Sequence, residues 1–245
     1  MASDSPIVAT NISMAYQMAS HRASSAKEYM INLMKRQVVY EKLWALNGVS
    51  MEVKHGEVVG VIGANGAGKS TLMKVLAGVL HPTDGRVIIR GSVSPMVEVS
   101  GGMNMELTGR ENIILNGTLL GRTPKDMAMR VDELADWAGV SAFLDMPMRG
   151  YSTGMKARLG FAIATDIKPD VLLVDEVLSV GDESFRAKSV DRIEYLMSGG
   201  TSVVMVSHSL PLIAQLCERA IWLDAGFVKA EGPVSEVVAA YKASV

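Results

Sequence analysis

Residues 63–70 read Gly63-Ala64-Asn65-Gly66-Ala67-Gly68-Lys69-Ser70, and they directly follow the apolar stretch Val58–Ile62. The run fits the pattern G-x-x-x-x-G-K-[ST] of a phosphate-binding loop (P-loop), which leaves a strand and opens a helix. Its glycines let successive backbone N–H groups turn towards one anion, because no Cβ blocks the approach. The helix that follows points its positive end at the same place. The sequence therefore predicts a site for a nucleoside triphosphate.

The chemistry of the loop suggests a role for each of its polar side chains. Lys69 can reach the β- and γ-phosphates, which makes it a candidate catalytic residue. The Ser70 hydroxyl can ligate Mg²⁺. A glycine-rich turn before an ordinary helix is the simpler interpretation, and the strand-then-helix context disfavours it. The nucleotide contacts are expected from Gly63, Asn65, Gly66, Ala67, Gly68, Lys69, Ser70 and Thr71.

The composition fits one large α/β domain. The chain has 245 residues, of which 49% are apolar, and its net charge is −2 with no basic stripe. Nucleic acid is therefore not an expected partner. The single cysteine, Cys217, excludes an internal disulfide and fits a reducing compartment. The first ten residues lack the layout of a signal peptide, and no apolar stretch is long enough to span a membrane. We expect a cytoplasmic chain that reaches a membrane through a partner.

Two further apolar runs predict neighbouring strands of a parallel sheet. Val171–Val174 and Val203–Val206 are continuously apolar, as in strands buried on both faces. Polar residues follow each run: Asp175 and Glu176 after the first, Ser207 and His208 after the second. Because ligands bind outside the carboxyl ends of parallel strands, these residues are expected to converge on the P-loop.

Helical spacing dominates two other regions. Leu72, Val75, Leu76 and Val79 predict a helix after the P-loop. The stretch from Glu111 to Ile167 predicts mostly helix, and we interpret about 104–167 as a helical subdomain inserted into one nucleotide-binding domain, residues 1–245.

The two ends of the chain predict shorter elements. Pro6–Tyr16 and Trp44–Val53 suggest strands, and Ile221–Glu231 suggests a hairpin around Ala225 and Gly226, followed by a closing helix at Pro233–Tyr241. The inserted segment 19–42 contains an amphipathic helix at 25–38 that begins with a capping box. That helix either packs on its own domain or lies against a membrane or a membrane subunit.

The stretch Tyr151-Ser152-Thr153-Gly154-Met155 lies between the P-loop and Asp175-Glu176. This order resembles the ATP-binding cassette (ABC) family, whose signature is usually LSGGQ, and here Ser152 and Gly154 are retained. The other landmarks of the resemblance follow in order. They are Tyr16 for the aromatic ring that stacks on adenine, Asp175 and Glu176 for the Walker B pair, 179–182 for the D-loop, and His208 for the switch histidine.

The resemblance implies a fold and a mechanism. The fold would be an α/β P-loop NTPase of the ABC type, with an antiparallel β portion and an inserted helical subdomain. Asp175 and Ser70 would hold Mg²⁺, Glu176 would accept the proton of the attacking water, and His208 would contact the γ-phosphate. Two chains would pair head to tail, so that Ser152 and Gly154 of one contact the ATP held by the other.

Three details resemble the ATPase subunits of polysaccharide exporters, which serve O-antigens, capsules, teichoic acids and galactans. They are the Tyr-Ser-x-Gly-Met signature, the run Thr108-Gly109-Arg110-Glu111-Asn112, and Val177-Leu178 after the Walker B pair. The resemblance implies ATP hydrolysis coupled to export of a lipid-linked polysaccharide through a polytopic membrane subunit, at the cytoplasmic face of the plasma (inner) membrane.

One position departs from the family. Most cassettes have a Gln before the helical subdomain that touches Mg²⁺ and senses the membrane partner, and none occurs between Arg90 and Thr108. Glu98 is the nearest candidate for that metal contact, and the alternative is that Glu98 is an ordinary loop residue.

Other functions stay open on the sequence alone. A soluble cassette ATPase acting on ribosomes or DNA usually has two cassettes or long coiled coils, and this chain has neither. Export of a small molecule is disfavoured by the altered signature and the missing Gln. Some polysaccharide exporters carry a further carbohydrate-binding domain after the closing helix, and we expect no recognition of a glycan cap by the residues present here.

Overall fold

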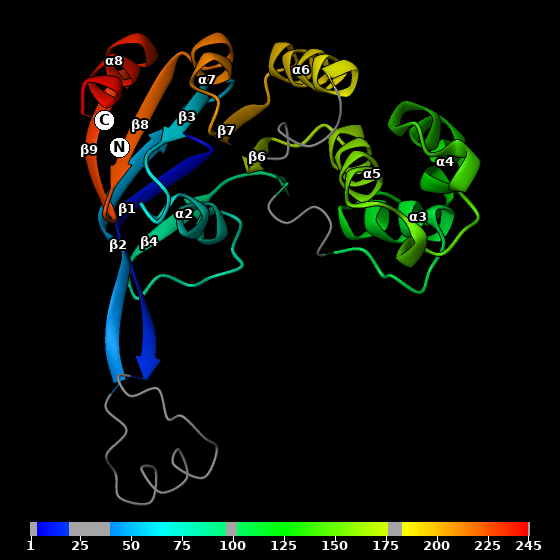
Figure 1. Cartoon of the computed structure of the whole chain (residues 1–245), viewed down its shortest axis with the longest axis horizontal. Helices are drawn as coiled ribbons and strands as arrows, with labels where there is room; N and C mark the ends of the chain where they lie inside the picture. The colour runs from blue at the N-terminus through cyan, green and yellow to red at the C-terminus, as the bar shows by residue number, and fades with distance from the viewer. Residues whose placement is uncertain (1–3, 20–39, 97–101, 176–182, 245) are drawn as a thin grey trace, which may run out of the picture.

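The fold described here is that of a computed structural model, which describes residues 4–19, 40–96, 102–175 and 183–244. Its two sheets differ in strand direction (Figure 1). The smaller sheet is antiparallel, with strand order β2-β1-β4, and comprises β1 (Ile7–Ala19), β2 (Tyr40–Val53) and β4 (Asp84–Ile89). The larger sheet has the order β5-β6-β7-β3-β8-β9. Its strands are β5 (Val93–Pro95), β6 (Val171–Asp175), β7 (Ser202–Val206), β3 (Val58–Ile62), β8 (Arg219–Asp224) and β9 (Phe227–Pro233).

The larger sheet is parallel from β5 to β8, and only β9 runs antiparallel. Its central strands are buried on both faces, as the continuous apolar runs predict. Alternate side chains of β6 face different cores: Leu172 and Val174 join the core that includes Phe161, while Val171 and Leu173 join the core under α2 and the antiparallel sheet. The prediction of a parallel sheet through Val171–Val174 and Val203–Val206 is confirmed.

Seven α-helices lie within the described residues: α2 (Lys69–Leu76), α3 (Gly109–Leu119), α4 (Pro124–Ala138), α5 (Thr153–Asp166), α6 (Glu183–Ser198), α7 (Leu210–Leu216) and α8 (Val234–Ser244). Short 3₁₀ turns occupy Ser141–Phe143 and Met148–Gly150. Among these described helices, none is both long and apolar enough to cross a membrane.

Helices α3, α4 and α5 form a cluster of their own at one end of the molecule (Figure 1). Their shared core includes Ile113, Leu134 and Leu159. Each helix begins with a side-chain cap: Thr108 forms a capping box with Glu111, Thr123 accepts from the Asp126 N–H, and Ser152 accepts from the Met155 N–H. The helical prediction for this region is confirmed, whereas its status as a separate subdomain stays a prediction.

The helix after the P-loop is shorter than its apolar stripe predicts. It ends at Leu76, and Gly78 adopts a left-handed conformation with φ of 71°. The Val79 N–H donates to Lys74 O and the Gly78 N–H to Val75 O, which is the Schellman pattern of a helix end. Val79 is 65% exposed, so including Val79 in the buried stripe was wrong.

The terminal elements follow the predicted order with shifted ends. Both N-terminal strands are longer than expected, since β1 continues to Ala19 and β2 begins at Tyr40. The hairpin β8–β9 turns at Ala225 and Gly226, whose φ angles of 46° and 84° suit a tight hairpin turn. The closing helix is α8. The predicted helix at 25–38 lies outside the described residues.

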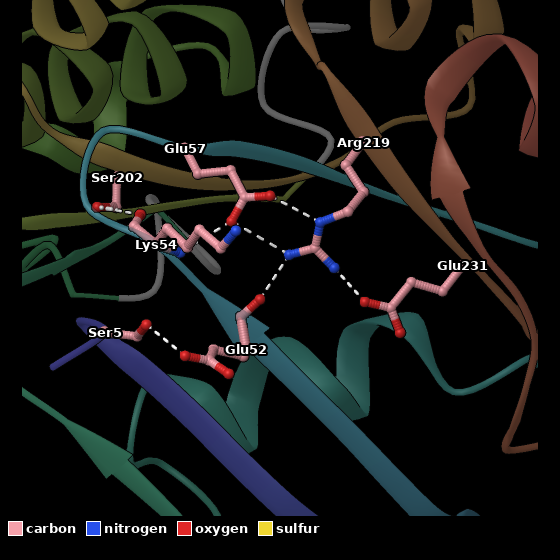
Figure 2. A network of polar contacts seen from close by, with 7 residues as sticks. All are labelled: Ser5, Glu52, Lys54, Glu57, Ser202, Arg219 and Glu231. Carbon is pink, nitrogen blue, oxygen red and sulfur yellow. Dashed lines mark hydrogen bonds and ion pairs between the residues drawn. The ribbon is translucent and has the colours of Figure 1, made fainter. Parts of the chain in front are cut away.

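A polar network centred on Arg219 joins the two sheets (Figure 2). The Arg219 guanidinium donates to both carboxylate oxygens of Glu57 (2.7 and 3.2 Å), to the backbone carbonyl of Glu52, and to Glu231. Burial alone raises the pKa of Glu57, but hydrogen bonds from Arg219 and the Lys54 N–H outweigh it, so this pKa lies below 4.5. The ion pair therefore connects the end of β2, the start of β3 and the β8–β9 hairpin.

Removing this cation while keeping its apolar stem should destabilise the fold. The side chains of Arg219 and Glu57 are 21% and 14% exposed, so Arg219→Met leaves a largely buried carboxylate without its partner. We expect a loss of about 2–4 kcal/mol in the free energy of unfolding by urea at pH 7. The control Lys229→Met removes the half-exposed Lys229–Asp224 pair and should cost less than about 1 kcal/mol.

The pH dependence of stability tests the role of Glu57 independently. Because the pKa of Glu57 is lowered in the folded state, its contribution is present above pH 4.5 and is lost as the pH falls through the folded value. The stability difference between wild type and Arg219→Met should therefore shrink in acid. A difference that is constant from pH 7 into the acid range would contradict the role given to Glu57.

Candidate nucleotide-binding site

The P-loop passes so close to neighbouring backbone that two of its glycines are sterically required. Gly63 and Gly68 have φ angles of 152° and 105°, and a Cβ on them would lie 2.2 Å from Leu223 O and 2.4 Å from Ala45 O. Gly66, with φ of 80°, has open space where its Cβ would be. The first two glycines therefore fit the loop against β8 and β2, and Gly66 leaves room beside the cavity that it lines.

Lys69 is held inside the loop that it belongs to. Its side chain donates to Gly63 O (2.8 Å) and Ala64 O (2.9 Å), and the residue is 6% exposed. These contacts hold the ammonium group within the curve of the loop. The cation predicted to contact phosphate is therefore oriented before any nucleotide arrives.

A cavity of about 190 Å³ opens at the start of α2. Ala67, between the lining residues Gly66 and Gly68, is 3% exposed, and its carbonyl oxygen accepts a hydrogen bond from the Gly226 N–H (3.0 Å). Gly68 precedes α2 and has no side chain that could cap the helix. The N–H groups in the first turn of α2 therefore face this cavity without a side-chain cap. The cavity is lined by Ala45, Asn65, Gly66, Gly68, Lys69, Ser70 and Thr71.

Among the described residues that line the cavity, Ala45 is the one that the sequence did not single out. It lies in β2, and Gly226 also packs closely against its carbonyl group. No local pattern marks such a residue, because its position depends on how β2 and the β8–β9 turn meet the P-loop. The pairing of distant strands would have been needed to find it.

Tyr16 lies beside the start of α2. It belongs to β1, is 37% exposed, and its hydroxyl lies 3.4 Å from Thr71 Oγ1 at the start of α2. An exposed ring beside a phosphate site has the surface that base stacking needs. The assignment of Tyr16 to the base stays a prediction.

The strand order brings the polar residues after β6 and β7 to the same edge as the P-loop. Strand β7 lies between β6 and β3, and Asp175 pairs in register with Val206, which in turn pairs with Val61. Ser207 and His208 follow directly, and His208 is exposed before α7. Asp175 thus ends β6 and His208 follows the end of the neighbouring strand β7, at the same end of the sheet as the P-loop. Glu176 and Glu98 lie outside the described residues.

The signature residues are not part of the P-loop cavity. Ser152 caps α5 through a 3.1 Å bond from the Met155 N–H, and no Cβ clash constrains Gly154. Tyr151 is buried behind them and donates to Phe143 O (2.8 Å); burial and the Asp145 carboxylate raise the pKa of Tyr151. Of the described residues that line the P-loop cavity, none comes from α5.

Comparison with known proteins places this geometry in a family. The family described as "ABC transporter" matches residues 46–179. The O-antigen export system ATP-binding protein RfbB of Klebsiella pneumoniae is 37% identical over 235 residues, which cover 95% of this chain and 96% of that protein. This chain belongs to the ABC transporter family.

Two further relatives are longer than this ABC cassette. RfbB of Myxococcus xanthus is 40% identical over 82% of this chain and 46% of its own length. The teichoic acids export ATP-binding protein TagH of Bacillus cereus is 40% identical over 95% of this chain and 42% of its own length. The chain thus spans less than half of these two relatives.

Solved structures confirm the predicted ABC fold. A dimeric, post-hydrolysis ATP-binding cassette bound to ADP and Pi superposes with a TM-score of 0.76 at 22% identity, covering 93% of this chain and 98% of that one. The α/β P-loop fold with an antiparallel sheet and added helices is therefore confirmed.

Replacing Lys69 tests whether the ABC cassette binds ATP through this loop. Lys69→Ala removes the cation and both of its bonds to loop carbonyls. We expect ATP affinity, measured by calorimetry, to fall at least about 100-fold, which corresponds to losing a charge-assisted contact of about 3 kcal/mol. The control Lys125→Ala changes an exposed α4 residue outside the cavity and should leave the affinity within about twofold. Equal ATP affinity in both variants would contradict the site.

Proposed function

We propose that this chain is the ATP-binding and ATP-hydrolysing subunit of an ABC transporter that exports a lipid-linked polysaccharide. The observation that carries the proposal is the near full-length similarity to an O-antigen export ATP-binding protein, together with a P-loop cavity suited to phosphate. The TagH relatives extend the similarity to teichoic acid export. These names support a polysaccharide cargo over the ribosome, DNA and small-molecule alternatives.

In the proposed reaction, ATP binds with its phosphates against the N–H groups of the loop and the Lys69 ammonium group. Phosphoryl transfer needs mainly positioning and electrostatic stabilisation, both of which a rigid cationic loop supplies. Glu176 would accept the proton of the attacking water, and His208 would donate to the γ-phosphate. Tyr16 would stack on the adenine ring.

Mg²⁺ fits the oxygen donors at the P-loop edge. Ser70 lines the cavity, Asp175 ends β6, and α2 packs against β6, so a hydroxyl and a carboxylate are available to a hard cation. Ser70 and Asp175 would hold this ion, whose positive charge would stabilise the negative charge that develops during phosphoryl transfer. Glu98 stays a candidate third ligand.

We propose a head-to-tail dimer for the ATP-bound state. The first turn of α5 has no acidic residue. At this end of the helix Ser152 and Thr153 are exposed, and Gly154 is partly exposed. A helix start of this kind can contact the γ-phosphate held by a second chain. ATP would then shift the population towards the dimer, and hydrolysis would reverse the shift.

The proposed partner is a polytopic membrane subunit, which would hold two copies of this chain at the cytoplasmic face of the plasma (inner) membrane. The lipid-linked polysaccharide would pass through that subunit and meet this chain indirectly. No nucleic acid is involved in the proposal. The segment 19–42 would lie near the membrane side of the assembly.

The substitution Glu176→Gln separates ATP binding from hydrolysis. The amide keeps the size of the side chain but cannot accept a proton, so we expect ATP turnover to fall at least about 100-fold. ATP binding should persist, and an ATP-dependent dimer should accumulate in sizing chromatography. Near-normal turnover would remove Glu176 from the role of base.

Affinity purification of tagged Glu176→Gln from native membranes with ATP tests the transport function. We expect a stoichiometric polytopic membrane protein and a lipid-linked glycan to co-purify. Recovery of ribosomes or DNA instead would overturn the export proposal while leaving the ATPase assignment intact. Lys69→Ala serves as the control, since it should not form the ATP-bound state.

A further inference from the structure

A second, larger cavity lies between the helical cluster and the parallel sheet. Its volume is about 550 Å³, and it is bounded by the α3–α4 turn, the end of α5, the helix α6 and Ser92 just before β5. None of the residues that line it belongs to the P-loop or to the signature. The ATPase function therefore leaves this cavity unexplained.

The cavity is strongly cationic. Its described lining includes four basic side chains, those of Arg122, Arg130, Lys168 and Arg192, against a single carboxylate, that of Asp166. The chain as a whole has a net charge of −2. A local excess of positive charge in a concave site raises the local concentration of anions.

Three of the four cations are held in place by the protein. Arg130 pairs with Asp166 (2.6 Å) and Glu133 (3.2 Å). Arg192 donates to Thr165 Oγ1 (3.4 Å) and stacks over Trp137. Lys168 lies 4.8 Å from the centre of the Tyr195 ring. Such side chains lose little conformational entropy when a ligand binds.

Two buried polar atoms at this site have no hydrogen bond within the described part of the chain: Arg130 Nε and Asp166 Oδ2. The Asp166 side chain is only 1% exposed, and burial raises the pKa of Asp166 despite the nearby cations. Leaving a buried donor or acceptor unsatisfied is costly, so evolution rarely retains one without a use. The guanidinium group of Arg130 therefore has hydrogen-bonding capacity that the described contacts do not use.

We propose that this cavity binds a phosphate-bearing anion, with Arg122, Arg130, Lys168 and Arg192 as its cationic contacts. Arginine forms paired hydrogen bonds with phosphate oxygens, which suits the three guanidinium groups. The anion belongs to a soluble phosphorylated molecule or to a phospholipid headgroup. Because α5 ends in this cavity and begins at the signature, the anion binds to the far end of the signature helix.

The site also joins two parts of the fold. Arg122, Arg130 and Asp166 belong to the helical cluster, whereas Arg192 and Tyr195 belong to α6. An anion held by both groups stabilises the arrangement of α3–α5 against α6 that is observed here. A ligand that binds one arrangement more tightly shifts the population towards it.

Calorimetric titration with inorganic pyrophosphate tests the proposal. Two full-length backgrounds keep the P-loop out of the measurement: wild type saturated with a non-hydrolysable ATP analogue, and Lys69→Ala. We expect saturable binding of one pyrophosphate per chain in both. Absence of saturable binding in both backgrounds would overturn the proposal.

Substitutions in the cavity test whether pyrophosphate binds there. Arg122 is exposed at the mouth, so Arg122→Gln should leave folding unchanged and weaken pyrophosphate binding about tenfold. Lys125→Gln removes an equal charge three residues further along the chain, outside the lining, and should change affinity less than about twofold. Asp166→Asn removes the only carboxylate among the described lining residues and should strengthen binding. Equal effects of Arg122→Gln and Lys125→Gln would overturn the assignment.

Vesicle flotation distinguishes the two sources of the anion. Phosphatidylcholine vesicles with and without phosphatidylglycerol are mixed with wild type and Arg122→Gln. Flotation that requires phosphatidylglycerol and Arg122 assigns the site to a phospholipid headgroup. Pyrophosphate binding without such flotation assigns it to a soluble phosphorylated molecule.

Discussion

The close fit of the P-loop backbone against β2 and β8 is the constraint on which the rest of the structure depends. Gly63 and Gly68 allow this fit because their missing Cβ atoms would overlap Leu223 O and Ala45 O. The turn of the β8–β9 hairpin completes it, since the Gly226 N–H donates to Ala67 O and the Asn47 N–H donates to Gly226 O. The antiparallel sheet, the hairpin and the parallel sheet must therefore all be in place before Lys69 and the start of α2 can present a phosphate site.

The parallel sheet places further polar residues beside this loop. Neighbouring strands β3, β7 and β6 end at one edge, so residues over a hundred positions apart in sequence meet there without any local signal linking them. The Arg219–Glu57 ion pair (Figure 2) lies at the other ends of the strands in this sheet, where β3 and β8 begin. The ion pair and the P-loop site thus lie at opposite strand ends of the same sheet. At the P-loop, the positive φ angles at Gly63, Gly66 and Gly68 are conformations that glycine tolerates.

The sequence predicted the P-loop, the buried strands and the hairpin well, because each has a strong local pattern. The end of α2 was misjudged because the apolar spacing continues to Val79, whereas Gly78 ends the helix by its left-handed conformation. Ala45 and the cationic cavity were missed for a different reason. They arise from contacts between distant elements, and neither an alanine in a strand nor arginines spread over 122–192 form a readable motif. The roles of Glu176, Glu98 and the segment 25–38 rest on the sequence, since these residues lie outside the described parts.

The central claim is that one ATP is held between the P-loop of one chain and the signature of another, and disulfide trapping measures this directly. Chains carrying Ala64→Cys are mixed with chains carrying Thr153→Cys, both in the Glu176→Gln background, and are oxidised with and without ATP. The natural thiol should not compete, because Cys217 is buried and burial raises its pKa to about 12. We predict a cross-linked dimer that needs ATP and both variants. Cross-linking that is independent of ATP, or equally strong within either variant alone, would contradict the head-to-tail site.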